Sequence, residues 1–201
     1  MAQRIIVVGA SGLIGSAVAQ ALEQQQHEVI RASRSSGERV DMSDPASVRD
    51  LFERVGTVDS VVSCAGGAPF KHVTELTAED YMAGLQDKAM GQINIATEAL
   101  KRLTDGGSIT LISGILTTVP IHGSVASAVA NGAVESYVRT AAAELPRGLR
   151  INAVSPTVLR EATGYHPSFP GFRQVPAADV AQAFVRSVEG VQSGEVFTLW
   201  A

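Results

Sequence analysis

Short apolar runs alternate with longer segments of helical periodicity along almost the whole chain. The apolar runs predict strands at 3–8, 28–32, 38–41, 59–64, 108–113, 149–154 and 195–200. The segments between them predict helices near 12–25, 45–55, 77–102, 124–145 and 176–188. Strands that alternate with helices favour right-handed crossovers and a parallel sheet covered on both faces. We therefore expect a single doubly wound, Rossmann-type α/β domain over residues 1–201, with about seven parallel strands and helices on both faces.

The longest irregular stretch, 160–175, is rich in proline, glycine and aromatic residues. It follows a late strand, and this order places it at the edge of the sheet where ligands bind in such folds. Its aromatic and imidazole side chains could line a substrate pocket, or they could anchor a lid that takes no part in the chemistry. These side chains are Tyr165, His166, Phe169 and Phe172.

The first predicted strand runs directly into a turn with three glycines. Gly9 permits a tight turn, Gly12 lets the backbone approach a pyrophosphate, and Gly15 lets the following helix pack close to the sheet. The N–H groups and positive dipole end of that helix would point at the phosphate. The alternative is a glycine turn that only connects a strand to a helix. The position of the turn favours a dinucleotide site, with contacts at Gly9, Ser11, Gly12, Leu13, Ile14 and Gly15.

The end of the second predicted strand bears on which dinucleotide binds. An NAD site favours an acidic residue there, which accepts hydrogen bonds from the ribose hydroxyls. Residues 31–36 contain two arginines, three serines and no acid. An arginine beside hydroxyl groups suits the 2′-phosphate of NADP(H), although a solvated basic turn is the alternative. We expect NADP(H) as the cofactor, with contacts at Ser33, Arg34 and Ser35.

Composition narrows the class of protein. The chain has 201 residues, 45% of them hydrophobic and 18% charged, which fits one α/β domain. Sixteen basic and twenty acidic side chains give a net charge of −4, and no basic run indicates a nucleic-acid partner. The single cysteine, Cys64, argues against a disulfide framework or a cysteine metal cluster, so no metal is expected. With neither a signal peptide nor a bilayer-spanning run in sight, we expect a cytoplasmic protein and no membrane partner.

The order of motifs over nearly the whole chain resembles the short-chain dehydrogenase/reductase family. Residues 40–42 resemble its short third strand, and residues 61–66 resemble its V-N-N-A-G strand end beside the adenosine half of the cofactor. Residues 133–156 resemble the helix after the catalytic lysine and the strand leading to the nicotinamide. The resemblance implies a nicotinamide cofactor. It adds the contacts Asp41, Met42, Cys64, Ala65, Gly66, Pro156, Thr157 and Leu159.

The chain departs from this family at every position of the catalytic tetrad. The family's tyrosine and lysine fall on Ser127 and Asn131. Its serine falls on Gly114, next to Ser113, and its helix asparagine falls on Lys88. The Ala-Asn-Gly-Ala motif at residues 130–133 and the chain length resemble a small bacterial subgroup that lacks the usual active-site residues, and the glycine spacing resembles the extended and atypical branches.

Carbonyl reduction needs a hydride, a proton for the new alkoxide and a donor that stabilises negative charge. Ser127 is a poor acid but can offer a hydrogen bond, whereas the ammonium of Lys88 becomes a usable proton donor if partial burial lowers its pKa. The alternative is an exposed helix lysine. The predicted catalytic set is therefore Lys88, Ser113 and Ser127. His122 is a second candidate proton donor or, alternatively, a surface imidazole.

The remaining tyrosine and the long helices indicate packing. Tyr137 lies ten residues beyond Ser127 on the same predicted helix, about 15 Å along its axis, so packing or a subunit contact explains it better than catalysis. Many small residues on the helices at 77–102 and 124–145, together with the family resemblance, predict a homodimer, or a homotetramer built from it.

The sequence leaves three functions open. The leading one is an atypical NADP(H)-dependent oxidoreductase that reduces a small carbonyl compound. The second is a catalytically silent dinucleotide-binding sensor or regulatory protein. An epimerase- or dehydratase-like enzyme is the third, and only the glycine spacing supports it.

Overall fold

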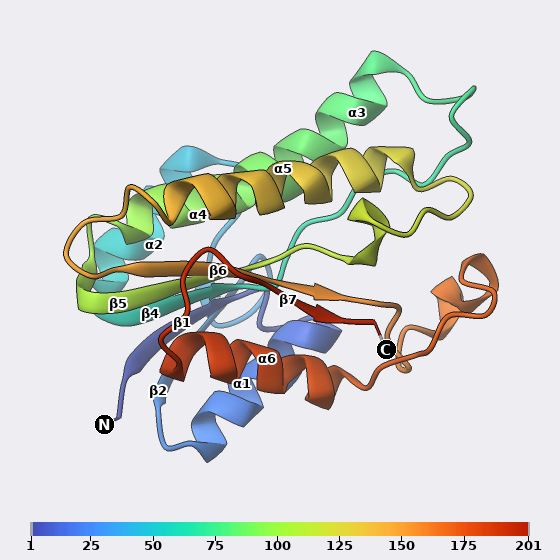
Figure 1. Cartoon of the computed structure of the whole chain (residues 1–201). Helices are drawn as coiled ribbons and strands as arrows, with labels where there is room; N and C mark the ends of the chain where they lie inside the picture. Colours follow the sequence, from blue (N-terminus) through green and yellow to red (C-terminus); the bar gives the residue numbers. More distant parts are fainter. Residues whose placement is uncertain (1, 201) are drawn as a thin grey trace.

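The computed structural model describes residues 2–200, which form one seven-stranded sheet in the order β3-β2-β1-β4-β5-β6-β7 (Figure 1). Every neighbouring pair of strands is parallel. The strands are β1 (Arg4–Val8), β2 (Glu28–Ser33), β3 (Glu38–Arg39), β4 (Val58–Ser63), β5 (Leu103–Ile112), β6 (Arg150–Pro156) and β7 (Val196–Leu199). The strand order reverses between β1 and β4, so the doubly wound fold expected from the sequence is confirmed.

Helices cover both faces of the sheet. Figure 1 shows α1 and α6 on one face and α2, α4 and α5 on the other. Their bounds are α1 (Leu13–Gln24), α2 (Pro45–Val55), α3 (Ala78–Gly84), α4 (Gly91–Ala99), α5 (Val125–Ala141) and α6 (Ala177–Glu189). Three shorter turns carry much of the functional site: the π-helical η1 (Leu85–Met90) and the 3₁₀ turns η2 (Ile115–Thr117) and η3 (Thr163–Ser168).

Strand β1 shows why the sheet needs helices on both sides. Ile6 and Val8 belong to the apolar cluster that includes Phe52 of α2, whereas Ile5 and Val7 belong to the cluster on the α1 and α6 face. Successive side chains of a strand point to opposite faces, so this continuous apolar run is buried on both faces of the sheet. Burial of one such side chain stabilises the fold by about 1.5–3 kcal/mol.

The prediction of a helix over residues 77–102 is wrong in one respect, because the helix is not continuous. α3 passes into the π turn η1 and then into α4, which ends at Ala99. Neighbouring backbone presses closely on this region, because a Cβ added to Gly66 would lie 2.7 Å from the Cα atom of Lys88. The strand expected at 108–113 likewise begins earlier, at Leu103, which pairs with Val58 before the register shifts.

Candidate functional site

The carboxyl ends of the central strands meet at one edge of the sheet, toward which the arrows of β6 and β7 point in Figure 1. The connections that leave this edge are residues 9–12 after β1, 64–77 after β4, 113–124 after β5 and 157–176 after β6. Ligands of open parallel sheets bind at this edge, next to the point where the strand order reverses. Two adjoining cavities lie here, and Gly67 lines both of them.

The glycine turn after β1 has the geometry that its sequence predicts. Gly9 has φ +82°, and a Cβ there would lie 2.9 Å from the Cβ atom of Ala65. A Cβ on Gly15 would lie only 2.1 Å from the carbonyl oxygen of Gly9, so helix α1 packs directly against the turn. A Cβ on Gly12 would meet nothing closer than 3.4 Å. The backbone at Gly12 therefore borders open space at the N-terminus of α1, where an anion is favoured.

The first cavity, of about 450 Å³, begins at this turn. Residues from β1, β2, β4 and the segment after β3 line it, and most of the predicted cofactor contacts are among them. The lining residues are Val8, Gly9, Ser11, Gly12, Ser33, Arg34, Ser35, Val40, Asp41, Met42, Cys64, Ala65, Gly66, Gly67 and Asp87. Leu13, Ile14 and Gly15, which were also predicted contacts, form the first turn of α1 and do not line this cavity.

The basic turn after β2 presents one free guanidinium to the cavity. Arg31 is already engaged, since its guanidinium forms an ion pair with Glu23 at 2.9 Å. Arg34 is exposed, lines the cavity, and takes part in none of the salt bridges found within residues 2–200. Ser33 has a structural role as well, because its hydroxyl donates to the carbonyl oxygen of Ser36 at 2.7 Å and so shapes the turn. The sequence alone could not separate these roles.

The second cavity, of about 280 Å³, brings together the three predicted catalytic residues. Lys88, Ser113 and Ser127 line it, and so do Pro156, Thr157 and Leu159 of the predicted cofactor set. The rest of its lining is largely apolar and includes Phe70, Ile115, Leu116, Val158, Tyr165 and Phe169. The aromatic rings of Phe70 and Tyr165 lie 6.2 Å apart. A cavity in which a few polar groups lie among apolar and aromatic side chains is typical of a site for a small organic ligand.

Lys88 lies in the π turn η1, and such turns occur frequently at functional sites. Its side-chain nitrogen Nζ donates to the carbonyl oxygen of Ser113 at 3.5 Å. Burial lowers the pKa of Lys88 to about 8, while the charge of the neighbouring Asp87 acts weakly in the opposite direction. Lys88 is therefore a hydrogen-bond donor whose proton is available near neutral pH.

Helix α5 presents a stripe of buried polar residues spaced four apart. Ser127 and Asn131 both line the second cavity and are 7% and 4% exposed. Asn131 was not in the predicted site, although its spacing from Ser127 was a usable signal. Asn131 Oδ1 and the hydroxyl oxygen of Thr157 are buried without a hydrogen-bond partner. Buried polar atoms are normally paired, so these two atoms fit a ligand that carries amide or hydroxyl groups.

The other candidate side chains differ in their surroundings. His122 is exposed and lines a different surface hollow together with Phe172. His166 places its Nε2 atom 2.9 Å from the carbonyl oxygen of Leu159, while Tyr165 and Phe169 reach the second cavity. Tyr137 packs against the core, as predicted for a residue without a catalytic role. Ser113 directs its hydroxyl at Glu135, at 2.9 Å, so that this hydroxyl is already engaged.

Residues 2–200 contain neither a membrane-spanning helix nor a cluster of metal-binding side chains. No helix in this part of the chain is both long enough and apolar enough to cross a membrane. Nor do any three histidine, cysteine, aspartate or glutamate side chains of these residues gather in an arrangement that could hold a metal ion.

Comparison with known proteins agrees with this geometry. A family model described as enoyl-(acyl carrier protein) reductase matches residues 2–196. Versicolorin reductase stcU of Emericella nidulans is 30% identical over 182 residues, which cover 77% of this chain and 68% of the relative. An uncharacterized oxidoreductase of Methylorubrum extorquens is 30% identical over 175 residues, which cover 75% of this chain and 71% of the relative.

Solved structures of similar fold include two with bound cofactor. Protein lin1944 of Listeria innocua superposes with a TM-score of 0.96 at 45% identity, covering 99% of this chain and 100% of that one. A small-chain dehydrogenase in complex with NADPH has a TM-score of 0.89 at 27% identity, covering 99% of this chain and 97% of its own. A short-chain dehydrogenase of Burkholderia cenocepacia in complex with NADP has a TM-score of 0.84 at 26% identity, covering 98% and 96%. The chain belongs to the short-chain dehydrogenase/reductase family.

Proposed function

We propose that this chain is an atypical NADP(H)-dependent oxidoreductase that reduces a small carbonyl compound in the second cavity. The observation that carries the proposal is Lys88, a donor with a pKa of about 8 that lines a largely apolar cavity next to the cavity at the glycine turn. Structural relatives in complex with NADPH and NADP support the choice of cofactor. Mixing the protein with NADPH and a panel of aldehydes and ketones, and following NADPH oxidation, tests the proposal.

The residues present fit this cofactor. The backbone from Gly9 to Gly12 would hold the pyrophosphate, and Arg34 would hold the 2′-phosphate. The unpaired atoms of Asn131 and Thr157 would accept or donate hydrogen bonds at the nicotinamide end. When bound, NADPH supplies the hydride that carbonyl reduction requires.

The proton comes from this chain. In the proposed mechanism, the ammonium of Lys88 hydrogen-bonds the substrate oxygen, stabilises the negative charge that develops there, and gives up a proton to the new alkoxide. Ser127 adds a hydrogen bond from α5, because its aliphatic hydroxyl is too weak an acid to replace the ammonium. The apolar lining around Phe70, Tyr165 and Phe169 favours a carbonyl compound with an apolar body.

A silent dinucleotide-binding protein is the second candidate function. It is favoured by one observation: the hydroxyl of Ser113 is engaged by Glu135 and leaves fewer free polar groups around the substrate position. The two candidates differ in a single result, since a sensor would bind NADPH and oxidise none of it with any carbonyl compound in the panel.

The reduction rate should fall as the pH rises. The folded protein holds the pKa of Lys88 at about 8, below its ordinary 10.5, and only the protonated form can supply the proton. The rate should therefore be constant below about pH 7 and fall about tenfold per pH unit above about pH 9. Initial rates of NADPH oxidation across this range measure the profile. A rate that stays flat to about pH 10 would exclude Lys88 as the proton donor.

Two glycine substitutions should separate folding from cofactor binding. Gly15→Ala places a Cβ against the carbonyl oxygen of Gly9 and should destabilise the protein by about 1–3 kcal/mol in urea unfolding. Gly12→Ala meets no such clash, so its stability should change little, but its methyl group enters the space proposed for the pyrophosphate. Calorimetric titration should then show weaker NADPH binding by Gly12→Ala. Equal losses of stability in both variants would contradict this division of roles.

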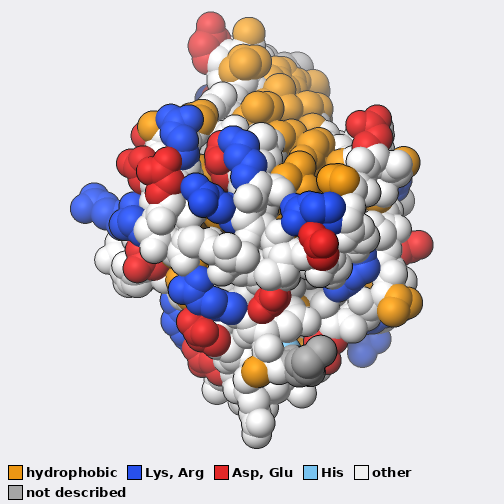
Figure 2. Space-filling view, turned by 90° about the vertical axis from the view of Figure 1, so that its left-hand side faces the viewer, with side chains coloured by type: hydrophobic (Ala, Val, Ile, Leu, Met, Phe, Trp, Pro, Cys, Tyr) orange, Lys and Arg blue, Asp and Glu red, His pale blue; other side chains and the backbone are white. Residues whose placement is uncertain are grey.

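We also propose that two copies of the chain associate through α5 and through the segment made of α3, η1 and α4. Hydrophobic side chains gather in a band that runs down the upper right of the molecule in Figure 2, and Figure 1 places α3, α4 and α5 in this upper part. Val125 and Val129 of α5, with Met82 and Met90 on the helices beside it, are exposed. Contiguous apolar surface of this kind favours a two-fold dimer. Light scattering at micromolar concentration should give at least twice the 21.0 kDa mass of one chain, and a monomer would contradict the interface.

A further inference from the structure

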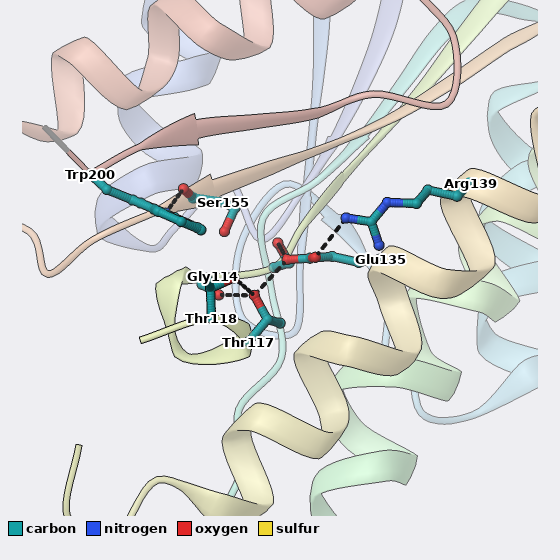
Figure 3. A network of polar contacts seen from close by, with 8 residues as sticks. Gly114, Thr117, Thr118, Glu135, Arg139, Ser155 and Trp200 are labelled. Carbon is teal, nitrogen blue, oxygen red and sulfur yellow. Dashed lines mark hydrogen bonds and ion pairs between the residues drawn. The ribbon is translucent and has the colours of Figure 1, made fainter. Parts of the chain in front are cut away.

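Glu135 is a buried carboxylate for which the proposed reaction has no use. It lies on α5, two turns beyond Ser127 and one turn beyond Asn131, and is 6% exposed. Its Oε1 atom accepts hydrogen bonds from the hydroxyls of Ser113 at 2.9 Å and Thr117 at 3.1 Å. Its Oε2 atom accepts from the guanidinium of Arg139 at 3.1 Å. Figure 3 shows the carboxylate between Thr117 and Arg139. A buried charge is normally retained only where it is paired in this way.

The two hydroxyls mark the two ends of one short turn. Ser113 follows β5, and Thr117 closes η2, where its backbone N–H donates to the carbonyl oxygen of Gly114 at 3.3 Å. The residues between them, Gly114, Ile115 and Leu116, all line the second cavity. A single carboxylate oxygen therefore fixes both ends of the turn that forms one wall of the proposed reaction site.

Ser113 joins this turn to Lys88. Its hydroxyl faces Glu135, while its carbonyl oxygen accepts the hydrogen bond from Nζ of Lys88. At 3.5 Å this contact is at the long limit for a hydrogen bond, so its strength depends closely on where the carbonyl is held. A small displacement of the 113–117 turn would remove the contact altogether.

We propose that Glu135 is a positioning residue that clamps the 113–117 turn to α5 and thereby holds Lys88 through the carbonyl of Ser113. It acts by accepting two hydroxyl protons on one oxygen, an arrangement that a carboxylate or an amide oxygen can provide and an aliphatic side chain cannot. Arg139 covers the outer oxygen, but its side chain is 56% exposed, so the clamp itself does not require it. The proposal builds on the role proposed for Lys88 but concerns its geometry, which can be measured without turnover.

Lysine NMR tests the clamp, because the chain contains only three lysines, Lys71, Lys88 and Lys101. In protein labelled with ¹³C-lysine, a held side chain gives two distinct Hε proton signals, whereas a freely moving one gives a single averaged signal. In the wild type we expect two distinct signals for Lys88. Glu135→Ala should collapse them to one and leave the signals of Lys71 and Lys101 unchanged. Glu135→Gln should retain two signals, since its amide oxygen can still accept from both hydroxyls.

Matched variants separate the clamp from a general loss of structure. Arg139→Met, which leaves both hydroxyl contacts in place, should preserve the Lys88 signals. The double variant Ser113→Ala/Thr117→Val should collapse the two Lys88 signals to one, although Glu135 keeps its charge and its ion pair with Arg139. This double variant serves as the test if Glu135→Ala does not fold. An averaged Lys88 signal in the wild type, or distinct signals in the double variant, would overturn the proposal. So would a collapse in Arg139→Met or Glu135→Gln.

Kinetics then separates this proposal from the proposed function. If the wild type reduces a carbonyl of the panel, Glu135→Ala should lower kcat about tenfold with little change in the Kd for NADPH, and Glu135→Gln should restore most of the rate. An unchanged kcat in Glu135→Ala would overturn the positioning role. If no carbonyl is reduced, the proposed function fails, and the lysine signals alone decide whether Glu135 holds Lys88.

Discussion

Replacing Lys88 with methionine should reduce the rate of carbonyl reduction by about 10²–10⁴-fold, the usual loss when a general acid is removed. Methionine is similar in length and leaves the π turn its apolar packing, but it has neither the proton nor the donor that faces Ser113. Binding of NADPH should persist, because the glycine turn and Arg34 line the other cavity. Stopped-flow or steady-state NADPH oxidation measures the rate, and calorimetry measures the binding.

Two variants serve as controls for this result. Ser127→Ala removes a hydrogen bond and leaves the proton source intact, so it should lower the rate about tenfold at most. Lys101→Met removes a surface lysine that pairs with Glu98 and should change nothing. Unchanged turnover in Lys88→Met would exclude any role of this lysine in the chemistry.

The fold could be predicted because its signals are local. The apolar run of β1 is buried on both faces, and an apolar run in the sequence marks most of the other strands, although the short β3 consists of Glu38 and Arg39. The roles of the glycines at 9, 12 and 15 could also be predicted, because the geometry that requires a glycine at each position depends on the adjacent strand and helix. Such patterns can be read from neighbouring residues alone.

The prediction of the helix around Lys88 shows the limit of what local sequence patterns can predict. Its continuous amphipathic pattern predicted an unbroken α-helix, and the π turn arises where backbone from another part of the chain, at Gly66, packs against it. Contacts of this kind depend on the tertiary arrangement, which periodicity does not encode. The same turn carries the residue on which the proposed chemistry depends, so the local prediction failed at the most informative point.

The catalytic residues were predicted as a group, but their individual roles were not. Lys88, Ser113 and Ser127 do line one cavity. Ser113, however, directs its hydroxyl at Glu135, which lies twenty-two residues away on another element. Only the packing of β5 against α5 reveals that contact. His122 could not be distinguished from a surface residue by its sequence context, and the structure places it in a separate hollow.

Arg34 should decide between the two nicotinamide cofactors. A charge-assisted contact with the 2′-phosphate is worth about 1.5–3 kcal/mol, so the wild type should bind NADPH about 10- to 150-fold more tightly than NADH. Arg34→Ala should remove most of this preference and leave the affinity for NADH nearly unchanged, since NADH has no 2′-phosphate. Calorimetric titration with each cofactor measures all four affinities.

The neighbouring arginine supplies the matched control. Arg31 lies three residues before Arg34, within β2, and carries the same charge, but it is paired with Glu23, so Arg31→Ala should leave the preference largely intact. If positive charge in general attracted NADPH, both variants would bind NADPH more weakly. Binding of NADPH by the wild type would then also become weaker at high salt concentration. Equal binding of NADPH and NADH by the wild type would exclude a 2′-phosphate site at Arg34. Asp41, an acidic residue that lines the same cavity, would then be the residue to test against the ribose hydroxyls of NADH.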